Sequence, residues 1–421
     1  MRVLVIGGGG REHAIVKALS HDTWVKALYA LPGNAGMREA VLVPGNEMDN
    51  AFVVDKAREL AIDFCVVTPD DPLANGLVDA MEQAGVPCFG PTRQAARIES
   101  SKVFAKQLMA DHGIPTARWR QADSFEAGAA ALKGFSYPLV IKADGLAKGK
   151  GVLIADDERQ ALRALKDIFS DKVFGDAGAR CVLEEFLQGP EVSVLALTDG
   201  DTLVTLPSAM DHKRVFDGDT GPNTGGMGVV CPNPYYTDDI ARQCMDTIFV
   251  PTLAAMREAG TPFRGCLFFG LMLTRQGPKA LEFNARFGDP ETQAVFTLLE
   301  NSPLDALLAC RFGGLTAQSL RFSPGAACAV VLASRGYPAK PEMGYPISAE
   351  PHDAQVLWAG VKQGQQGLIT SGGRVAAVCA RADTLQEAVE RAYRAARSVR
   401  FEGAHMRTDI GRRALAAQEE Q

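Results

Sequence analysis

The stretch RVLVIGGGGREHA (residues 2–14) decides the fold class of this chain. An aliphatic run ends in four glycines, and a helical pattern follows them. The same order recurs over the first hundred residues, where apolar runs at 26–31 and 64–67 alternate with amphipathic stretches at about 52–61 and 73–84. Such alternation is typical of βαβ units on a parallel sheet. The sequence therefore predicts an α/β fold (α+β overall) that begins with a Rossmann-like domain.

The four glycines form a loop whose backbone N–H groups and following helix N-terminus suit a phosphate group. The loop does not fit the dinucleotide-binding fingerprint, because the third glycine of that motif falls on Glu12 or His13. The second strand also ends at Pro32 without the acidic residue that would bind a ribose. A tight turn without a ligand is the simpler alternative, and we favour phosphate binding.

The composition is that of an ordinary globular protein. The chain has 421 residues, of which 47% are hydrophobic and 22% charged, and its 44 Lys and Arg against 50 Asp and Glu leave a net charge of −6. Disorder, collagen and coiled coil are thereby excluded. The mildly acidic balance without a basic block argues against a nucleic-acid partner and a membrane-surface role.

Cysteine usage and hydropathy predict the compartment. Nine cysteines are scattered without a C-x-x-C motif, which favours free thiols in a reducing environment. No apolar run approaches the roughly 20 residues of a membrane helix, and the run Val3–Ile6 is far shorter than a signal-peptide core. We therefore expect a cytoplasmic protein with no membrane partner.

Capping signals and strand patterns organise the rest of the chain. Ser101 as a helix cap, with Gly113 and Pro115 as stop signals, predicts a helix at about 101–112, where a new domain begins. The further expected elements are strands at 138–143, 152–155 and 181–187, a helix at 157–169, paired strands over 192–290 with a helix at 238–259, strands at 329–333 and 373–380, and a helix at 384–399.

The glycine-rich turn GLAKGKG (145–151) resembles a Walker A sequence. It is one residue short, however, and has Gly151 where the magnesium-binding Ser or Thr should stand. The turn is better interpreted as a mobile lid, in which glycines permit close approach to phosphates and Lys148 and Lys150 supply charge. A plain solvated hairpin is the alternative.

The strand KALEFNARF (279–287) carries a candidate metal site. Its period of two places Glu282, Asn284 and Arg286 on one face, and Leu281, Phe283 and Ala285 on the other. A carboxylate and an amide oxygen two residues apart are hard ligands suited to magnesium held jointly with phosphates, and Arg286 adds a permanent charge. A merely solvated strand face is the alternative.

Two further stretches are candidate ligand contacts. DHKRVFDGDTGPNTGGMG (211–228) is too rich in glycine for a regular element and too polar for a core loop, so it either lines a substrate pocket or forms a disordered connection. In EEFLQGPE (184–191), the backbone after Glu185 could bind an adenine edge and Glu191 a ribose, although adjacent glutamates are usually just solvated. No Ser/His/Asp or Cys/His set emerges from the six histidines.

Several long strings taken together closely resemble the glycinamide ribonucleotide synthetases, which are ATP-grasp ligases of purine biosynthesis. The resemblance covers essentially the whole chain. The strings that carry it are GGGGREHA (7–14), PGNAG (32–36), SKVFAK (101–106), IKADGLAKGKGV (141–152), LEEFL (183–187), DHKRVFDGDTGPNTGGMG (211–228) and LEFNARFGDPETQ (281–293).

The resemblance implies a Rossmann-like N-terminal domain over 1–100, an ATP-grasp body over 101–120 and 190–322, a mobile lid over 121–189, and a C-terminal α/β domain over 323–421. It further implies small-molecule substrates, with ATP as co-substrate and Mg²⁺ or Mn²⁺ as cofactor, and we expect a monomer.

The resemblance also assigns candidate site residues. The implied metal ligands are Glu282 and Asn284. The implied ATP contacts are Lys102, Lys142, Lys148, Gly149, Lys150, Gly151, Glu184, Glu185, Phe186, Leu187 and Glu191. The implied substrate contacts are Gly8, Gly9, Gly10, Arg11, Asp211, Lys213, Pro222, Asn223, Thr224, Gly225, Gly226, Met227, Arg286 and Asp289. The implied catalytic residues are Lys142, Asp211, Lys213 and Arg286.

The chain departs from the family pattern at a few positions. Asp70 stands where the family usually has Glu, and Gly189-Pro190-Glu191 replaces Gly-Glu-Glu. The implied reaction joins glycine to 5-phosphoribosylamine at the expense of ATP, through a glycyl phosphate. A related ligase that activates bicarbonate or formate, a non-catalytic nucleotide-binding protein and a nicotinamide oxidoreductase are the alternatives.

Overall fold

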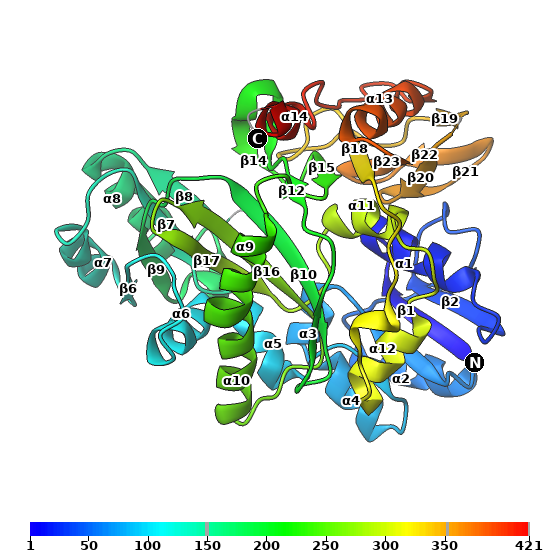
Figure 1. Cartoon of the computed structure of the whole chain (residues 1–421), viewed down its shortest axis with the longest axis horizontal. Helices are drawn as coiled ribbons and strands as arrows, with labels where there is room; N and C mark the ends of the chain where they lie inside the picture. Colours follow the sequence, from blue (N-terminus) through cyan, green and yellow to red (C-terminus); the bar gives the residue numbers. More distant parts are fainter. Residues whose placement is uncertain (148–150, 351–352, 420–421) are drawn as a thin grey trace.

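The computed structural model describes residues 1–147, 151–350 and 353–419, and Figure 1 shows how they are arranged. Within these residues the strands form four sheets of four or five strands and three two-stranded pairs. Among the described helices none is long and apolar enough to cross a bilayer. All nine cysteines are free, as the sequence predicts, and all are buried.

The first sheet is entirely parallel and confirms the Rossmann-like N-terminal architecture. Along its central strand Leu4 and Ile6 pack into one core, whereas Val3 and Val5 pack into another, so both faces are covered and the run is apolar throughout. Its strands in spatial order are β3 (Val41–Leu42), β2 (Ala27–Pro32), β1 (Arg2–Gly7), β4 (Phe64–Val67) and β5 (Cys88–Phe89). Its helices are α1 (Gly10–Ser20), α2 (Asn50–Glu59), α3 (Asp70–Ala74) and α4 (Leu77–Gln83).

The second sheet is antiparallel and lies at the left of Figure 1 with its own small core. Helix α8 (Glu158–Phe169) packs on it through Ala161, Leu165 and Ile168, which recur at helical spacing. The strand order is β6 (Trp119–Ala122), β9 (Cys181–Glu185), β7 (Leu139–Ala143) and β8 (Val152–Ala155), and α7 (Phe125–Leu132) lies beside α8.

The third sheet is antiparallel and forms the centre of the molecule (Figure 1). Its order is β11 (Leu203–Thr205), β10 (Glu191–Thr198), β16 (Gly265–Thr274) and β17 (Gly277–Asn284). The helices near it are α5 (Arg93–Ser100), α6 (Lys102–Asp111), α9 (Asp238–Cys244), α10 (Val250–Glu258) and α12 (Leu304–Phe312), with a π-helical turn at Met245–Phe249 that joins α9 to α10.

The fourth sheet combines two distant parts of the chain. Strand β12 (Met210–Asp211) pairs with β15 (Gly228–Cys231), and β15 pairs in turn with a strand formed after residue 325. The remaining strands are β18 (Ala326–Ala333), β23 (Arg374–Ala382) and β20 (Gln355–Trp358). Helix α11 (Glu291–Thr297) covers one face and α13 (Leu385–Ala396) the other. The last helix is α14 (Arg412–Glu419). Three pairs of short strands complete the fold: β13 (Arg214–Phe216) with β14 (Thr220–Asn223), β19 (Ser348–Ala349) with β24 (Val399–Arg400), and β21 (Val361–Gly364) with β22 (Gly367–Thr370).

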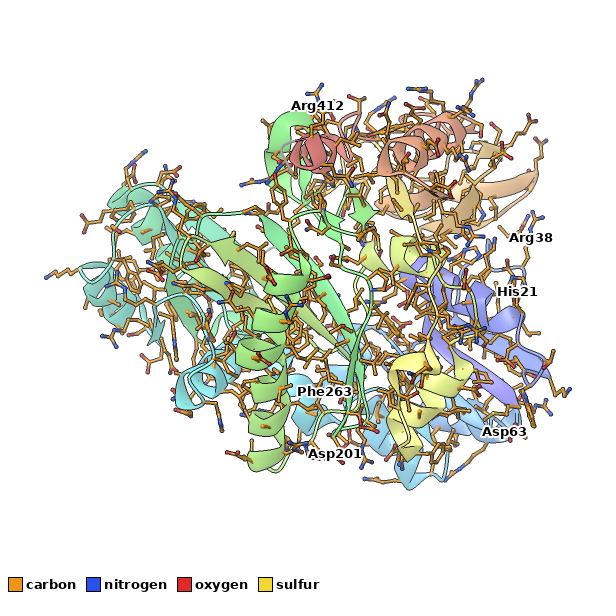
Figure 2. All side chains as sticks on the ribbon, in the orientation of Figure 1. His21, Arg38, Asp63, Asp201, Phe263 and Arg412 are labelled. Atoms are coloured by element: carbon orange, nitrogen blue, oxygen red, sulfur yellow. The ribbon has the colours of Figure 1, made fainter. Side chains whose placement is uncertain are left out.

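Side chains fill the space between these layers (Figure 2). Phe263 is fully buried in the central core, whereas Arg38, Asp63 and Arg412 project at the periphery of the view.

The structure differs from the sequence predictions in three places. The helix expected at 73–84 is broken, because Gly76 adopts φ +82° and separates α3 from α4. The stretch 211–228 is not one irregular loop, since it contains the β13–β14 hairpin. In β17 a bulge at Leu281 interrupts the alternation, so Ala280 and Glu282 oppose successive residues of β16.

Candidate functional site

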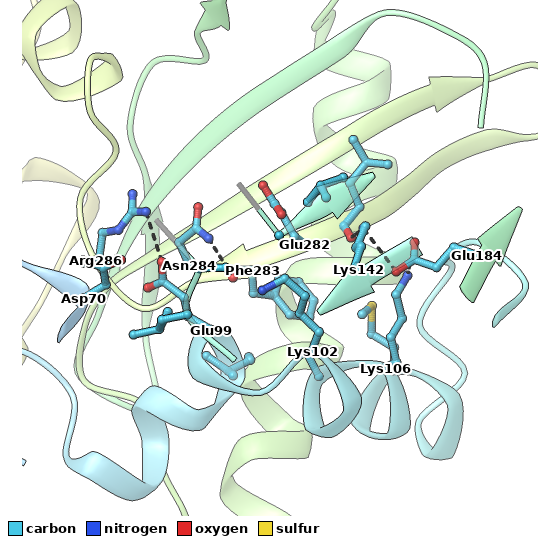
Figure 3. A pocket seen from close by; sticks show the side chains of 18 residues that line it. Asp70, Glu99, Lys102, Lys106, Lys142, Glu184, Glu282, Phe283, Asn284 and Arg286 are labelled. Carbon is cyan, nitrogen blue, oxygen red and sulfur yellow. Dashed lines mark hydrogen bonds and ion pairs between the residues drawn. The ribbon is translucent and has the colours of Figure 1, made fainter. Parts of the chain in front are cut away.

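A cavity of about 150 Å³ lies between α6, β17 and the second sheet (Figure 3). Its polar lining combines lysines at one end with carboxylates and an arginine at the other. The polar lining residues are Asp70, Glu99, Lys102, Lys106, Lys142, Glu184, Glu282, Asn284 and Arg286.

Three lysines gather at one end of the cavity. Lys102 and Lys106 lie four residues apart on α6 and so share a helix face, while Lys142 comes from β7. Glu184 lies between two of them, with its oxygens 3.0 Å from Lys106 Nζ and 3.1 Å from Lys142 Nζ. Lys106 and Lys142 share Glu184, whereas Lys102 donates to the Gly145 carbonyl, so the three ammonium groups leave this end with a surplus of positive charge over that carboxylate.

Glu282 and Asn284 project from β17 toward the same cavity, as the period of two predicts (Figure 3). Burial raises the pKa of Glu282, but Lys213, Lys142, Lys102 and Arg286 outweigh it, and the pKa lies below its usual value. The carboxylate is therefore ionised at neutral pH. Asn284 donates its amide N–H to the Phe283 carbonyl, and its amide oxygen has no hydrogen-bond partner among residues 1–147, 151–350 and 353–419, so it is available to a ligand.

The far end of the cavity joins two sheets. Arg286 lies 3.0 Å from Glu99, which is buried and also accepts a hydrogen bond from the Ala285 backbone. Asp70, at the start of α3, lines the same end. Burial would raise the pKa of Asp70, but Arg286 and Arg11 outweigh it and lower the pKa, so Asp70 is also ionised.

A second group of charges surrounds the glycine-rich segment after the β13–β14 hairpin. The Asp211 carboxyl has one buried oxygen without a hydrogen-bond partner. Burial and the nearby Glu291 raise the pKa of Asp211, against the opposing charges of Lys213 and Arg374. Gly226 comes so close that a Cβ there would lie 2.7 Å from that same Asp211 oxygen.

Arg374, from β23, fixes this segment to the rest of the site. It lies 2.8 Å from the Asp289 carboxylate and donates to the backbone carbonyls of Gly225, Gly226 and Asp289. The fourth sheet thus reaches directly into the site.

The N-terminal glycine loop lies against the same group. Gly9 N–H donates to Glu12, and Arg11 pairs with Glu12 and donates to the Phe287 carbonyl. A Cβ on Gly10 would lie 2.8 Å from the Gln293 amide nitrogen. The loop therefore borders α11 and the residues that follow β17.

The buried side-chain atoms that lack a hydrogen-bond partner are concentrated around these groups. In the described part of the chain they are Glu47 Oε2, Glu184 Oε1, Asp211 Oδ1, Arg286 Nε and Gln293 Oε1. Glu184 Oε1 has Lys142 within ion-pair distance, and the other four atoms have unused hydrogen-bonding capacity. Buried polar atoms are normally satisfied, so this concentration indicates a place where a ligand completes the bonding.

The structure brings most of the predicted site residues together. Glu191 and Lys213, predicted for different substrates, form an ion pair of 2.6 Å. Glu185 pairs with Lys279 instead of entering the cavity, Phe186 is exposed and Leu187 is buried. Gly151 lines the cavity, whereas Pro222, Asn223, Thr224 and Met227 form the segment that includes Gly225 and Gly226. Lys148, Gly149 and Lys150 lie outside the described residues.

Sequence reasoning missed four residues that the structure places in or beside the site. They are Glu99, Lys106, Glu291 and Arg374. Lys106 lies in the string SKVFAK, and its spacing of four residues from Lys102 could have signalled a shared helix face. Nothing local marks Arg374, which is distant in sequence from its partners.

Comparisons with known proteins agree along the whole chain. Residues 1–99, 100–292 and 327–413 match the models described as phosphoribosylglycinamide synthetase N domain, ATP-grasp (A) domain and C domain. A phosphoribosylamine–glycine ligase from Rhizobium meliloti is 44% identical over 99% of both chains. The human trifunctional purine biosynthetic protein adenosine-3 is 43% identical over 99% of this chain, which spans 42% of its length.

Solved structures are similar as well. A crystal structure of phosphoribosylamine–glycine ligase from Thermotoga maritima has 36% identity and a TM-score of 0.83, covering 97% of this chain and 100% of that one. A biotin carboxylase domain from Hydrogenobacter thermophilus, described in complex with MgADP, has 16% identity and a TM-score of 0.75, over 96% of this chain and 91% of that one, and shows the shared fold alone.

The fold and the lysine-lined cavity define an ATP-grasp ligase, an enzyme that acts on small molecules and whose superfamily uses ATP with a divalent metal ion. The chain belongs to the phosphoribosylglycinamide synthetase family of purine biosynthesis.

Proposed function

We propose that this protein ligates glycine to 5-phosphoribosylamine, with ATP converted to ADP and phosphate and glycinamide ribonucleotide as the product. The observation that carries the proposal is one continuous set of charges. The set begins at the three lysines of the cavity, where we place the nucleotide, and continues through Glu282. It ends at Asp211, Arg374 and Asp289, where we place the other substrates.

The nucleotide belongs at the lysine end. The surplus positive charge of Lys102 and Lys142 suits the phosphates, and the apolar lining from Met109, Leu146 and Leu281 suits a flat base. We assign Glu184 to Leu187 to the adenine edge and Glu191 to the ribose, as the family resemblance implies.

A divalent metal ion fits Glu282 and Asn284. An ionised carboxylate and an available amide oxygen form a donor set of hard oxygen ligands. Within the described residues no group of three or more His, Cys, Asp or Glu side chains is arranged to bind a metal ion by itself, so these two residues need further ligands. The two residues would hold Mg²⁺ or Mn²⁺ together with phosphate oxygens. When bound, the ion neutralises charge on the transferred phosphoryl group.

The chemistry requires an activated carboxylate. The glycine carboxylate attacks the γ-phosphorus and the bond to the bridging oxygen of ADP breaks, which yields glycyl phosphate. The amine of phosphoribosylamine then attacks the acyl carbon, phosphate leaves and the amine loses a proton. Arg286 and Lys213 stabilise the developing negative charges, and no covalent enzyme intermediate is needed.

Asp211 is suited to the amino group of a substrate. Its unpartnered buried oxygen accepts a hydrogen bond from an amine or ammonium, and the nearby Glu291 favours binding of that positive charge. We assign residues 222–227 to glycine or to the ribose phosphate, and the loop Gly8–Arg11 to the ribose phosphate.

We propose the boundaries 1–100, 101–120 with 190–322, 121–189, and 323–421 for the four domains. A lid over 121–189 that closes on the nucleotide would shield the acyl phosphate from water.

The test is release of ADP and phosphate by the purified protein with Mg-ATP, with glycine and freshly generated phosphoribosylamine supplied separately and together. We expect glycinamide ribonucleotide only when both are present. Turnover with bicarbonate or formate and a purine intermediate instead would refute the proposed acceptor, and ATP binding without turnover on any acceptor would refute the ligase.

A further inference from the structure

Lys106 is the most deeply buried lysine of the cavity, and the family resemblance gives it no role. The residue is 2% exposed and lies on α6, one turn after Lys102. A buried lysine is costly unless it is paired, so its partners define what it does.

The amine of Lys106 is held by protein groups at the wall of the cavity. It donates to Thr116 Oγ1 at 2.7 Å and lies 3.0 Å from Glu184 Oε2. Thr116 in turn donates to the Ala280 carbonyl at 2.6 Å, which ties this end of α6 to β17. At least two of the three donor directions of the ammonium are therefore used within the protein.

Glu184 connects Lys106 to Lys142. It is 2% exposed, and its second oxygen lies 3.1 Å from Lys142 Nζ, which also donates to the Leu281 carbonyl (Figure 3). Two lysines thus share one carboxylate. If Lys106 were neutral, Glu184 would be a buried anion, and among the described residues its remaining ion-pair partner would be Lys142, which we assign to the phosphates.

We propose that Lys106 is a positioning residue that neutralises Glu184 and thereby leaves Lys142 available to the phosphates of the nucleotide. This inference rests on the proposed nucleotide site but goes beyond it, because it gives Lys106 a role through Glu184 rather than through contact with ATP. Removing only the Lys106 charge should trap Lys142 in an ion pair, whereas removing both charges should release it.

The experiment compares Lys106→Met, Glu184→Gln and the double variant. Affinity for a non-hydrolysable Mg-ATP analogue is measured by calorimetry, so the result does not depend on turnover, and thermal unfolding is followed in parallel. Lys166→Met, at an exposed lysine that pairs with Asp171 on the second sheet's helix α8, is the matched control and should bind the analogue as the unmodified protein does.

We expect Lys106→Met to weaken binding at least tenfold, and the double variant to bind within threefold of Glu184→Gln. A double variant as weak as Lys106→Met, or Lys106→Met with unchanged affinity, would overturn the inference. If Lys106→Met does not fold, Lys106→Gln, which keeps a hydrogen bond to Glu184 without the charge, decides by the same comparison. Absent turnover on all substrates with normal analogue binding would instead count against the proposed reaction.

Discussion

Glu282→Gln tests the metal assignment most directly, because the substitution keeps the side-chain shape and removes one charge. At an effective dielectric constant of about 20, a unit charge about 4 Å from an opposite charge contributes about 4 kcal/mol. Part of this lost interaction energy is recovered in the variant, because the cations around Glu282 then interact more strongly with the phosphates. We expect kcat to fall at least about 10²-fold, which corresponds to about 2.7 kcal/mol or more.

The assay for Glu282→Gln is steady-state ADP release at saturating glycine, phosphoribosylamine and magnesium. Glu300→Gln, at an exposed position, is the control and should keep the normal rate. The kcat of the variant should fall more than its nucleotide affinity, because a metal ion held by Glu282 would act chiefly on the transferred phosphoryl group. A near-normal kcat at saturating magnesium would refute the assignment of Glu282 as a ligand.

Three further perturbations address other parts of the molecule. Arg11→Ala should raise KM for phosphoribosylamine and leave KM for ATP unchanged, and an equal rise in both would exclude phosphate binding by Arg11. Gly226→Ala adds a Cβ 2.3 Å from Pro290 Cδ at φ +109°, so initial-rate measurements should show at least a tenfold rise in KM for glycine, and an unchanged KM would place glycine elsewhere. The hydrogen bond from His13 lowers the pKa of Glu39 to about 2, so its stabilising contribution is present above pH 4.5 and is lost as pH falls toward 2. Denaturant unfolding should therefore show Glu39→Gln to be less stable by about 1 kcal/mol at neutral pH, after discounting for solvent screening, with the difference vanishing near pH 2, whereas a constant difference would contradict the linkage.

The sequence predicted the parts of the site that depend on local periodicity. Glu282 and Asn284 share a face because a strand alternates, and that holds in the structure. Strict alternation predicts Leu281 on the opposite face with Phe283, but the bulge opposite Gly270 and Leu271 removes Leu281 from the alternation. A bulge depends on the partner strand, so the sequence of one strand does not reveal it.

Contacts between segments that are distant in the sequence could not be predicted from local sequence patterns. Arg374 falls within the strand predicted at 373–380, and the pairing of β23 with β18 and of β18 with β15 brings it to Gly225 and Asp289. Lys106 falls within the helix predicted at about 101–112, and its partner Glu184 follows 78 residues later in the sequence (184 − 106). Both roles depend on contacts between different sheets, and the pattern of one segment carries no information about such contacts.

The mixed origin of the fourth sheet has a consequence for protein engineering. A polypeptide that stopped at residue 322 would keep Gly228–Cys231 but lose the neighbour that covers its outer edge, and it would lose the guanidinium that fixes the segment beside Asp211. An open strand edge of this kind attracts other chains and favours aggregation. The last hundred residues are therefore not an exchangeable module, and swapping them between relatives requires that the stretch 210–231 be transferred with them.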